Sequence, residues 1–169
     1  MELHICGLDE VTHIKKNRKV NKILSLTEFV VPPYVGEGIG SGHTQILVED
    51  IEHFTNVDDR FPPNSKVIDT IIAFGRSLKE DDVALIHCFA GISRSTAAAL
   101  IIMVDKGFDP EEAGKFIRQI RSIAAPNRML CKLADQYFGT YHGDGPLFMV
   151  ADRMNNERGF RVSINNKLV

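Results

Sequence analysis

A cysteine and an arginine lie six positions apart in residues 87–96, which read HCFAGISRST. The apolar run 83–86 leads into this segment and the largely apolar run 96–103 follows it, so the segment should join a strand to a helix. A loop of this length can direct several backbone N–H groups at one tetrahedral anion that sits at the helix N-terminus. We therefore expect a phosphate-binding loop that contains its own nucleophile.

Each residue type in this loop has a place in such chemistry. Cys88 would attack as a thiolate, a form that the helix N-terminus and Arg94 both favour. The planar guanidinium of Arg94 can bond two phosphoryl oxygens at once, and Gly91 lets the backbone approach the ligand. Ser95 can donate a hydrogen bond to the departing sulfur, and His87 would orient the loop from below. The expected phosphate-binding residues are Cys88, Phe89, Ala90, Gly91, Ile92, Ser93 and Arg94.

Breaking a phosphoester also requires a proton for the leaving oxygen, so a carboxylic acid should face Cys88 across the phosphate. The candidate acids on nearby loops are Glu49, Asp50, Glu52, Asp58 and Asp59. Asp50 is the best placed because it follows an expected strand, 45–48, and loops at the carboxyl ends of neighbouring strands share one rim. Position alone leaves open whether Asp50 is the acid or only caps a turn.

The rest of the chain must position this loop and its acid. Strands in the first half, helices in the second and one strand–helix pair at the loop predict an α/β fold, a single domain whose central, mainly parallel or mixed sheet is flanked by helices. The expected strands are 3–8, 23–26, 43–48 and 83–87, and the expected helices are 65–78, 94–106, 110–120 and 128–138.

Two of these helices have recognisable starts and apolar stripes that should face the core. Asp109, followed by a proline and two acidic residues, is a typical helix cap. The stripe of this helix is Ala113, Phe116, Ile117 and Ile120. The next helix begins after Pro126 and Asn127, and its stripe is Leu130, Leu133, Ala134, Tyr137 and Phe138.

Two other segments resemble binding motifs, but we expect both to be plain loops. The five basic residues Lys15, Lys16, Arg18, Lys19 and Lys22 could bind an acidic partner, although a solvated turn is more typical of such a run. Residues 35–42 alternate glycine as a dinucleotide-binding loop does, but a strand rather than a helix should follow them.

The composition excludes several classes of protein. The chain has 169 residues, 25% of them charged, and a net charge of −2, which suits one domain and no nucleic-acid partner. We see neither a secretory signal nor a membrane-spanning segment. Cys6, Cys88 and Cys131 form no CxxC pair, so we expect no disulfide, metal or cofactor, and a cytoplasmic location. Whether Cys6 or Cys131 can act as a resolving thiol stays open.

The loop pattern His-Cys-x-x-Gly-x-x-Arg-Ser, which starts at His87, resembles the signature of the cysteine-dependent protein tyrosine phosphatase superfamily. Residues 48–50 and their spacing from Cys88 are similar to the dual-specificity branch, and the resemblance covers residues 3–141. It implies that Cys88 is the nucleophile, Arg94 the phosphate ligand, Ser95 the thiolate stabiliser and Asp50 the general acid and base. Asn127 matches a position that helps to hold the active loop in the family.

The resemblance implies a metal-independent phosphatase that forms a cysteinyl-phosphate. Its expected substrate is a phosphorylated protein, with phosphotyrosine first and phosphoserine or phosphothreonine also accepted. The chain has no tryptophan, and therefore no Trp-Pro-Asp loop of the large tyrosine-specific enzymes, and Ser122 replaces a proline common in relatives. No lysine lies between Cys88 and Arg94, which disfavours phosphoinositides. An RNA 5′-phosphatase and a non-catalytic phosphate-binding module are the alternatives.

The C-terminal part of the chain carries the weakest pattern. We expect residues 1–142 to form the phosphatase domain and residues 143–169 to be an extension of unknown role packed on the same domain. The apolar runs 148–150 and 160–164 could form a hairpin or a docked tail. Nothing in the sequence indicates the oligomeric state or a membrane partner.

Overall fold

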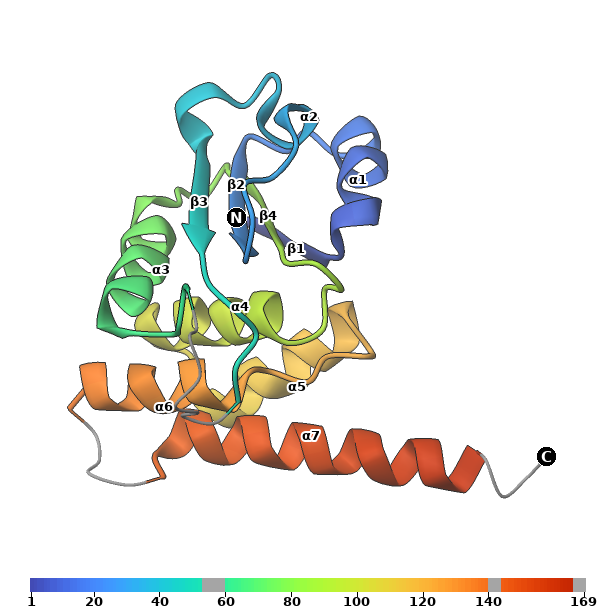
Figure 1. The fold of residues 1–169 in the computed structure, drawn as a ribbon, viewed down its shortest axis with the longest axis vertical. Coiled ribbons are helices and arrows are strands. Elements are labelled where there is room, and N and C mark those ends of the chain that lie inside the picture. Colours follow the sequence, from blue (N-terminus) through green and yellow to red (C-terminus); the bar gives the residue numbers. More distant parts are fainter. Residues whose placement is uncertain (53–59, 140–143, 166–169) are drawn as a thin grey trace.

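A computed structural model describes residues 1–52, 60–139 and 144–165, with side chains described up to Glu157 (Figure 1). The central sheet has four strands in the order β1-β4-β2-β3, and every neighbouring pair is parallel. The strands are β1 (Glu2–Cys6), β2 (Lys22–Thr27), β3 (His43–Leu47) and β4 (Val83–His87). The expected central sheet is therefore confirmed, and it is wholly parallel within the described residues.

Helices cover both faces of this sheet. They are α1 (Val11–Asn17), α2 (Pro33–Gly36), α3 (Ser65–Ser77), α4 (Arg94–Asp105), α5 (Pro110–Ile120), α6 (Arg128–Tyr137) and α7 (Pro146–Asn165), with short 3-10 turns at Leu8–Glu10 and Gly40–Gly42. Alternation along β2 sends Leu24 and Leu26 toward the core shared with α3 to α7, and Ile23 toward the smaller core under α1 and α2. No helix in the described part of the chain is long and apolar enough to cross a membrane.

The central helix α4 has its first ten residues, from Arg94 to Met103, buried between the sheet and the outer helices. Small side chains permit this close approach. A Cβ added to Gly75 of α3 would lie 2.9 Å from Ile102, so α3 and α4 can pack this tightly only around a glycine. The position of α4 matters because its first turn carries Arg94.

Side-chain caps begin α3, α5 and α6. Asn64 accepts hydrogen bonds from two backbone N–H groups of α3, and Asp109 does the same for α5, as its sequence predicts. The Asn127 side chain accepts from the N–H of Leu130 at 2.9 Å in the first turn of α6. Gly107, with a φ of +91°, follows the end of α4.

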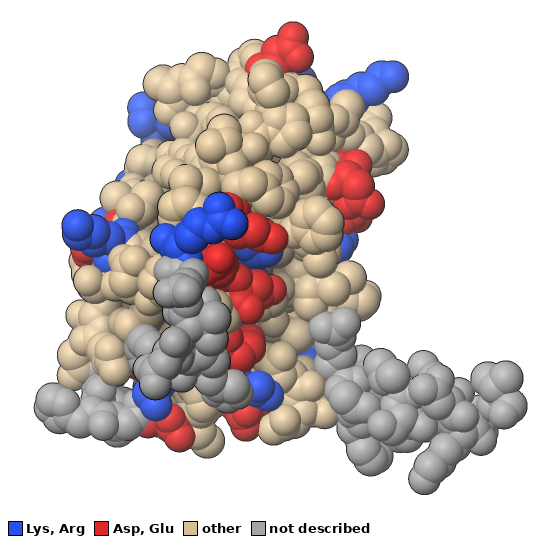
Figure 2. Space-filling model, in the orientation of Figure 1, with Lys and Arg blue, Asp and Glu red and all other residues tan. Residues whose placement is uncertain are grey.

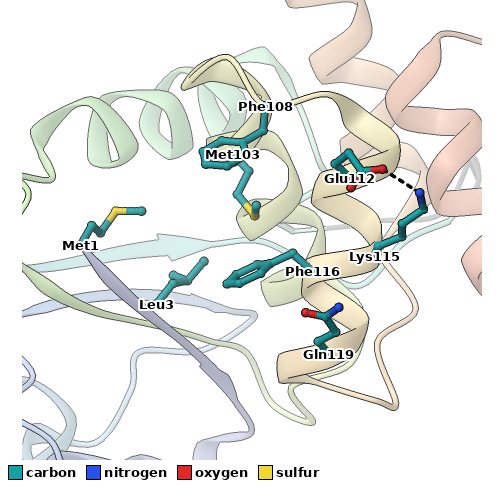
Figure 3. Close-up of a pocket in the computed structure, with 8 residues that line it drawn as sticks. All are labelled: Met1, Leu3, Met103, Phe108, Glu112, Lys115, Phe116 and Gln119. Atoms are coloured by element: carbon teal, nitrogen blue, oxygen red, sulfur yellow. Dashed lines mark hydrogen bonds and ion pairs between the residues drawn. The ribbon is translucent and has the colours of Figure 1, made fainter.

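The predicted apolar stripe of α5 is wrong at two positions. Ala113 and Ile117 are buried, but Phe116 and Ile120 are 41% and 37% exposed. The third buried residue of α5 is Gly114, which the predicted stripe did not include and which packs against Val150 of α7. Because α7 covers α5 from another side, Phe116 faces a groove beside β1, which Figure 3 shows lined also by Met1, Leu3, Met103 and Phe108. In α6, the predicted core residue Tyr137 is likewise 42% exposed.

The basic run is not a simple turn. Its first part belongs to α1, and Lys15 Nζ donates hydrogen bonds to the carbonyls of Tyr34, Val35 and Glu37 at 2.8, 2.9 and 2.8 Å. Lys15 therefore satisfies carbonyl groups at the end of α2. Lys16, Arg18 and Lys19 are exposed, as a solvated run should be.

A hairpin in residues 148–164 is wrong, because α7 runs through this segment along α5 and α6 (Figure 1). Leu147, Val150, Ala151 and Met154 are buried along one face of α7 and belong to the main core. Asp135 of α6 caps α7, since its carboxylate accepts from the N–H groups of Leu147 and Phe148 at 3.1 and 2.9 Å. A buried cap and an apolar face dock this helix on the domain.

Candidate active site

The active-site loop, residues 87–96, surrounds a hollow of about 350 Å³ at the junction of β4 and α4. We call this hollow the cysteine pocket. Its lining includes Cys88, Arg94, Asp50, Glu52 and Asn155, together with Phe89, Ala90, Ile92, Ser93 and Ala125. The loop therefore brings the expected nucleophile and arginine to one cavity, and Asp50 reaches it from the segment after β3.

The buried sulfur of Cys88 contacts two polar groups of the active-site loop. It accepts a hydrogen bond from the N–H of Gly91 at 3.2 Å, and Ser95 Oγ lies 3.3 Å from it. A hydroxyl and an N–H group that both face a sulfur stabilise its negative form. The Ser95 hydroxyl is thus within hydrogen-bond distance of the sulfur.

Gly91 is required by close packing beneath the loop. It has a φ of +67°, and an added Cβ would lie 2.3 Å from the carbonyl carbon of Cys6 and 2.4 Å from the nitrogen of Gly7. No side chain fits at that distance, and only glycine adopts this backbone conformation readily. The end of β1 thus sets how deep the active-site loop can sit.

Arg94 is held by hydrogen bonds at one end of its guanidinium but not at the Nε. Its NH1 group donates to the carbonyl of Val48 at 2.8 Å and to the carboxylate of Glu28. The Nε atom is buried and has no hydrogen-bond partner among the described residues. A buried donor without a partner is rare and costly, and an anion in the cysteine pocket would satisfy it.

Asp50 is fixed by two side chains from different elements. Its Oδ1 accepts hydrogen bonds from Ser93 Oγ at 2.6 Å and from Asn127 Nδ2 at 2.9 Å. Its Oδ2 lies 3.9 Å from Arg94 Nε. The side chain of Asn127, which is fully buried, also donates to the carbonyl of Ile51 at 3.1 Å. It therefore connects residues 50 and 51 to the start of α6.

The other candidate acids are placed differently. Glu49 accepts from the N–H of Phe61 at 3.4 Å and does not line the cysteine pocket. Glu52 lines the pocket but accepts from the N–H of Arg128 at 3.3 Å. Asp58 and Asp59 lie outside the described residues. Asp50 contacts the active-site loop through its hydrogen bond with Ser93.

Glu28 is a site residue that sequence reasoning missed. It follows β2, and its carboxylate binds NH1 of Arg94. Burial would raise its pKa, but hydrogen bonds from Arg94 and from its own backbone, with the Arg94 charge, lower the pKa on balance. The signal that could have found it is the rule used for Asp50, since β2 also ends at this rim of the parallel sheet.

His87 lies below the loop and does not line the cysteine pocket. Its Nε2 is 2.6 Å from Ser25 Oγ, and its Nδ1 is 3.3 Å from the carbonyl oxygen of Cys88. Burial lowers the pKa of His87 to about 4, so the ring is neutral at physiological pH. The neutral ring thus bridges β2 and the backbone of Cys88.

The back of the loop is held by an ion pair that the sequence did not suggest. Arg121 donates from Nε to the carbonyl of Gly91 at 3.0 Å and from NH2 to the carbonyl of Ala90 at 3.2 Å. The same guanidinium pairs with Glu10, which in turn accepts from the N–H of Gly7 at 2.8 Å. These contacts bind two carbonyl groups of the active-site loop to Arg121, which does not itself line the cysteine pocket.

The two other cysteines, Cys6 and Cys131, do not line the cysteine pocket. Burial, with nearby carboxylates, raises the pKa of Cys6 to about 12 and the pKa of Cys131 well above its usual range. Both side chains are fully buried free thiols. Thiols of this kind are inert compared with a stabilised thiolate.

A cysteine sulfur under an anion-binding loop is the arrangement of the cysteine-dependent phosphatases, which carry the phosphoryl group on that sulfur. Residues 8–136 match the family model described as "Dual specificity phosphatase, catalytic domain", and the chain belongs to this family.

Individual relatives agree with this assignment. The chain is 34% identical over 97 residues to the tyrosine-protein phosphatase yvh1 of Schizosaccharomyces pombe, covering 57% of this chain and 27% of that protein. It is 30% identical over 79 residues to the protein tyrosine phosphatase type IVA 3 of Bos taurus, covering 45% and 46%. The chain thus spans less than half the length of these relatives.

Solved structures share the fold. The structure of DUSP15 superposes with a TM-score of 0.60 at 21% identity, covering 91% of this chain and 90% of that one. The PTP-2 phosphatase of Cydia pomonella also gives 0.60, at 20% identity, covering 80% and 85%.

Proposed function

We propose that the chain is a protein phosphatase that hydrolyses phosphotyrosine, and also phosphoserine or phosphothreonine, through a cysteinyl-phosphate. The observation that carries this proposal is the convergence of Cys88, Arg94 and the carboxylate of Asp50 on one pocket, with no hydrogen-bond partner for the Arg94 Nε among the described residues. Each residue supplies a different requirement of the reaction, namely a nucleophile, a ligand for the phosphoryl oxygens and a proton.

In the first step the Cys88 thiolate attacks phosphorus, so the S–P bond forms as the bond to the leaving oxygen breaks. The loop N–H groups and Arg94 stabilise the charge on the equatorial oxygens. Asp50, protonated at the start, gives its proton to the leaving oxygen, and the dephosphorylated protein departs. Ser93 and Asn127 orient this carboxyl group through the hydrogen bonds described above.

In the second step water attacks the phosphocysteine and releases inorganic phosphate. Asp50, now a carboxylate, accepts the proton of the attacking water and is ready to act as an acid again. The S–P bond breaks, and the sulfur leaves as a thiolate that the Ser95 hydroxyl and the Gly91 N–H stabilise. His87 and Asn127 act as positioning residues throughout.

Charge supports a protein substrate over RNA. A column of acidic side chains runs over the segment that leaves β3 on the face shown in Figure 2. Asp50 and Glu52, which line the pocket, are 42% and 30% exposed, and Glu28, which binds Arg94, is 43% exposed. A polyanion would have to approach these charges, whereas a single phosphoryl group need reach only Arg94.

Within this proposal residues 1–142 form the catalytic domain, and residues 143–169 extend it, with α7 as a support of the site. Asn155 of α7 lines the cysteine pocket and donates to the carbonyl of Pro126 at 2.9 Å, next to Asn127. The free thiols of Cys6, Cys88 and Cys131 support a reducing, cytoplasmic location.

The test is phosphate release from three substrates in EDTA: a phosphotyrosine peptide, the matched phosphothreonine peptide and a triphosphorylated RNA. We expect the highest kcat/KM on phosphotyrosine, lower turnover of phosphothreonine and inhibition of both by vanadate, which imitates the five-coordinate phosphorus. Faster turnover of the RNA would overturn the assigned substrate. Binding of the peptides without any phosphate release would indicate a phosphate-binding module instead.

A further inference from the structure

A second hollow, of about 750 Å³, lies directly beside the cysteine pocket, and we call it the side pocket. The two pockets share Phe89 and Ala90 of the active-site loop. The other residues that line the side pocket are Leu8, Asp9, Glu10, Tyr34, Arg121 and Ile123. A ligand that places its phosphate over Cys88 therefore has this cavity as its immediate neighbour.

The side pocket carries a concentration of exposed apolar side chains. Phe89 is 59% exposed, and Tyr34 and Ile123 are each 43% exposed. Scattered apolar residues need no explanation on a surface, but three large ones around one cavity indicate a binding site. Their exposure costs free energy that a bound apolar group would return.

The charged groups in the side pocket do not favour a second phosphate. Arg121 is the one cation among the described residues that line it, and the Arg121 guanidinium is occupied by Glu10 and by the carbonyls of Ala90 and Gly91. Asp9 is exposed at the rim and repels anions. The cavity thus suits an apolar group and disfavours an acidic one.

The wall next to the nucleophile is held in place before any ligand binds. The ring of Phe89 makes an edge-on contact with Phe29, with centroids 6.3 Å apart and planes at 83°. The carbonyl of Phe89 accepts from the N–H of Leu8 at 3.0 Å. A wall fixed on both sides loses little conformational freedom when a side chain packs against it.

We propose that the side pocket binds a large apolar side chain of the substrate protein, from a residue that flanks the phosphorylated one. Neighbouring Cα atoms are about 3.8 Å apart, so a side chain next to the phosphoresidue can enter a cavity that begins at Phe89. This inference rests on the proposed phosphatase function and adds the sequence preference of that site. Tyr34 and Ile123 are its specificity-determining residues.

The experiment compares two phosphotyrosine peptides that differ only in their flanking residues, leucine in one and aspartate in the other. We expect the wild-type chain to prefer the leucine peptide in kcat/KM by about tenfold or more. Ile123→Ala should reduce that preference by about threefold to tenfold. Tyr34→Ala is the second variant, in case the first is unstable, and should act in the same direction.

Para-nitrophenyl phosphate is the reference substrate because it has no flanking residue, and each variant should hydrolyse it within about twofold of wild type. Phe108→Ala is the matched control. Phe108 is 51% exposed but lines the groove beside β1 (Figure 3), so this variant should keep the leucine preference.

Equal rates on the two peptides, or a preference that Ile123→Ala and Tyr34→Ala leave intact, would overturn the inference while hydrolysis of the reference substrate upholds the phosphatase function. If the wild-type chain hydrolysed neither the peptides nor the reference substrate, the proposed phosphatase function itself would be rejected. Hydrolysis of a phosphoinositide in lipid vesicles faster than both peptides, and sensitive to Ile123→Ala, would assign the side pocket to a lipid chain and also overturn the inference.

Discussion

The active-site loop and helix α7 both line the cysteine pocket, but they reach it in different ways. The loop spans residues 87–96, and the order of those residues already places the sulfur, the N–H groups and the guanidinium together. Helix α7 reaches the pocket only because it packs on α5 and α6, which brings Asn155 to the carbonyl of Pro126. The sulfur and the guanidinium are thus local in the chain, whereas Asp50 and the support from α7 are not.

The active-site loop and α7 also differ in how deeply their interacting side chains are buried. Inside the loop, Arg94 and Ser95 are almost completely buried. On α7, Asp152 is 41% exposed and pairs with Arg128 Nε at 2.9 Å, and Arg128 NH1 lies 3.7 Å from Glu52 near the acid. We therefore expect loop substitutions to lower turnover and α7 substitutions to lower mainly stability.

The largest expected effect is that of Cys88→Ser. A hydroxyl is a far weaker nucleophile than a thiolate in this pocket, so kcat on para-nitrophenyl phosphate should fall by a factor on the order of 10⁴ or more. Cys131→Ala is the control: it removes a buried cysteine outside the pocket and should leave kcat within about threefold. Turnover of Cys88→Ser at the wild-type rate would reject the mechanism.

The second-largest loss of activity is expected for Asp50→Asn. Asparagine can still accept the hydrogen bond from Ser93 but has no proton to give, so turnover of poor leaving groups such as alkyl phosphates should fall by about 10²-fold or more. Para-nitrophenyl phosphate, a better leaving group, should suffer less. Glu49→Gln is the matched control. An equal loss on both substrates, or none, would transfer the acid role to Asp58 or another carboxylate.

The buried, neutral His87 should cause a pH dependence of folding stability. Its pKa is about 4 in the folded chain against 6.5 for an ordinary histidine, so between these values only the unfolded chain binds the proton. This contribution to stability is complete above pH 6.5 and is lost as the pH falls toward 4, by about 1.4 kcal/mol per pH unit.

Urea unfolding at several pH values measures this dependence. Compared with wild type, His87→Gln should flatten the fall in free energy of unfolding below pH 6.5. A slope in His87→Gln identical to that of wild type would contradict a neutral His87 in the folded chain.

The smallest effect should come from α7. Asp152→Asn weakens a partly exposed ion pair, so it should cost about 1 kcal/mol of stability or less and change kcat by less than about threefold. Asp81→Asn, in the exposed turn before β4, is the control for removal of one surface carboxylate. A loss of kcat close to that of Asp50→Asn would mean that α7 takes part in the chemistry and would erase the contrast between the two regions.

Patterns that depend on near neighbours in the chain were predicted well. The strand, loop and helix around Cys88 follow from an apolar run, a glycine and a second apolar run, and Asp109 caps its helix as expected. The approach of Asp50 to the loop followed from the rule that parallel strands end at a common rim, and its contact with Ser93 agrees.

Predictions that depended on an unknown neighbour were wrong. Phe116 has the right spacing for the core but faces a groove, because α7 covers a different side of α5. Residues 148–150 suggested a strand, yet the carboxylate of Asp135 and the core under α7 select a helix. Helical or strand preference in such short apolar runs is weaker than the tertiary contacts they make.

The amino-acid sequence by itself therefore determined the reactive groups, because a cysteine, a glycine and an arginine at this spacing can fold into only a narrow loop at a helix N-terminus. The tertiary structure alone decided what surrounds them. The Arg94 contact with Glu28 joins residues 66 positions apart, and the Arg121 contact with Glu10 joins residues 111 apart. Contacts at such separations depend on how whole elements pack, which no local pattern records.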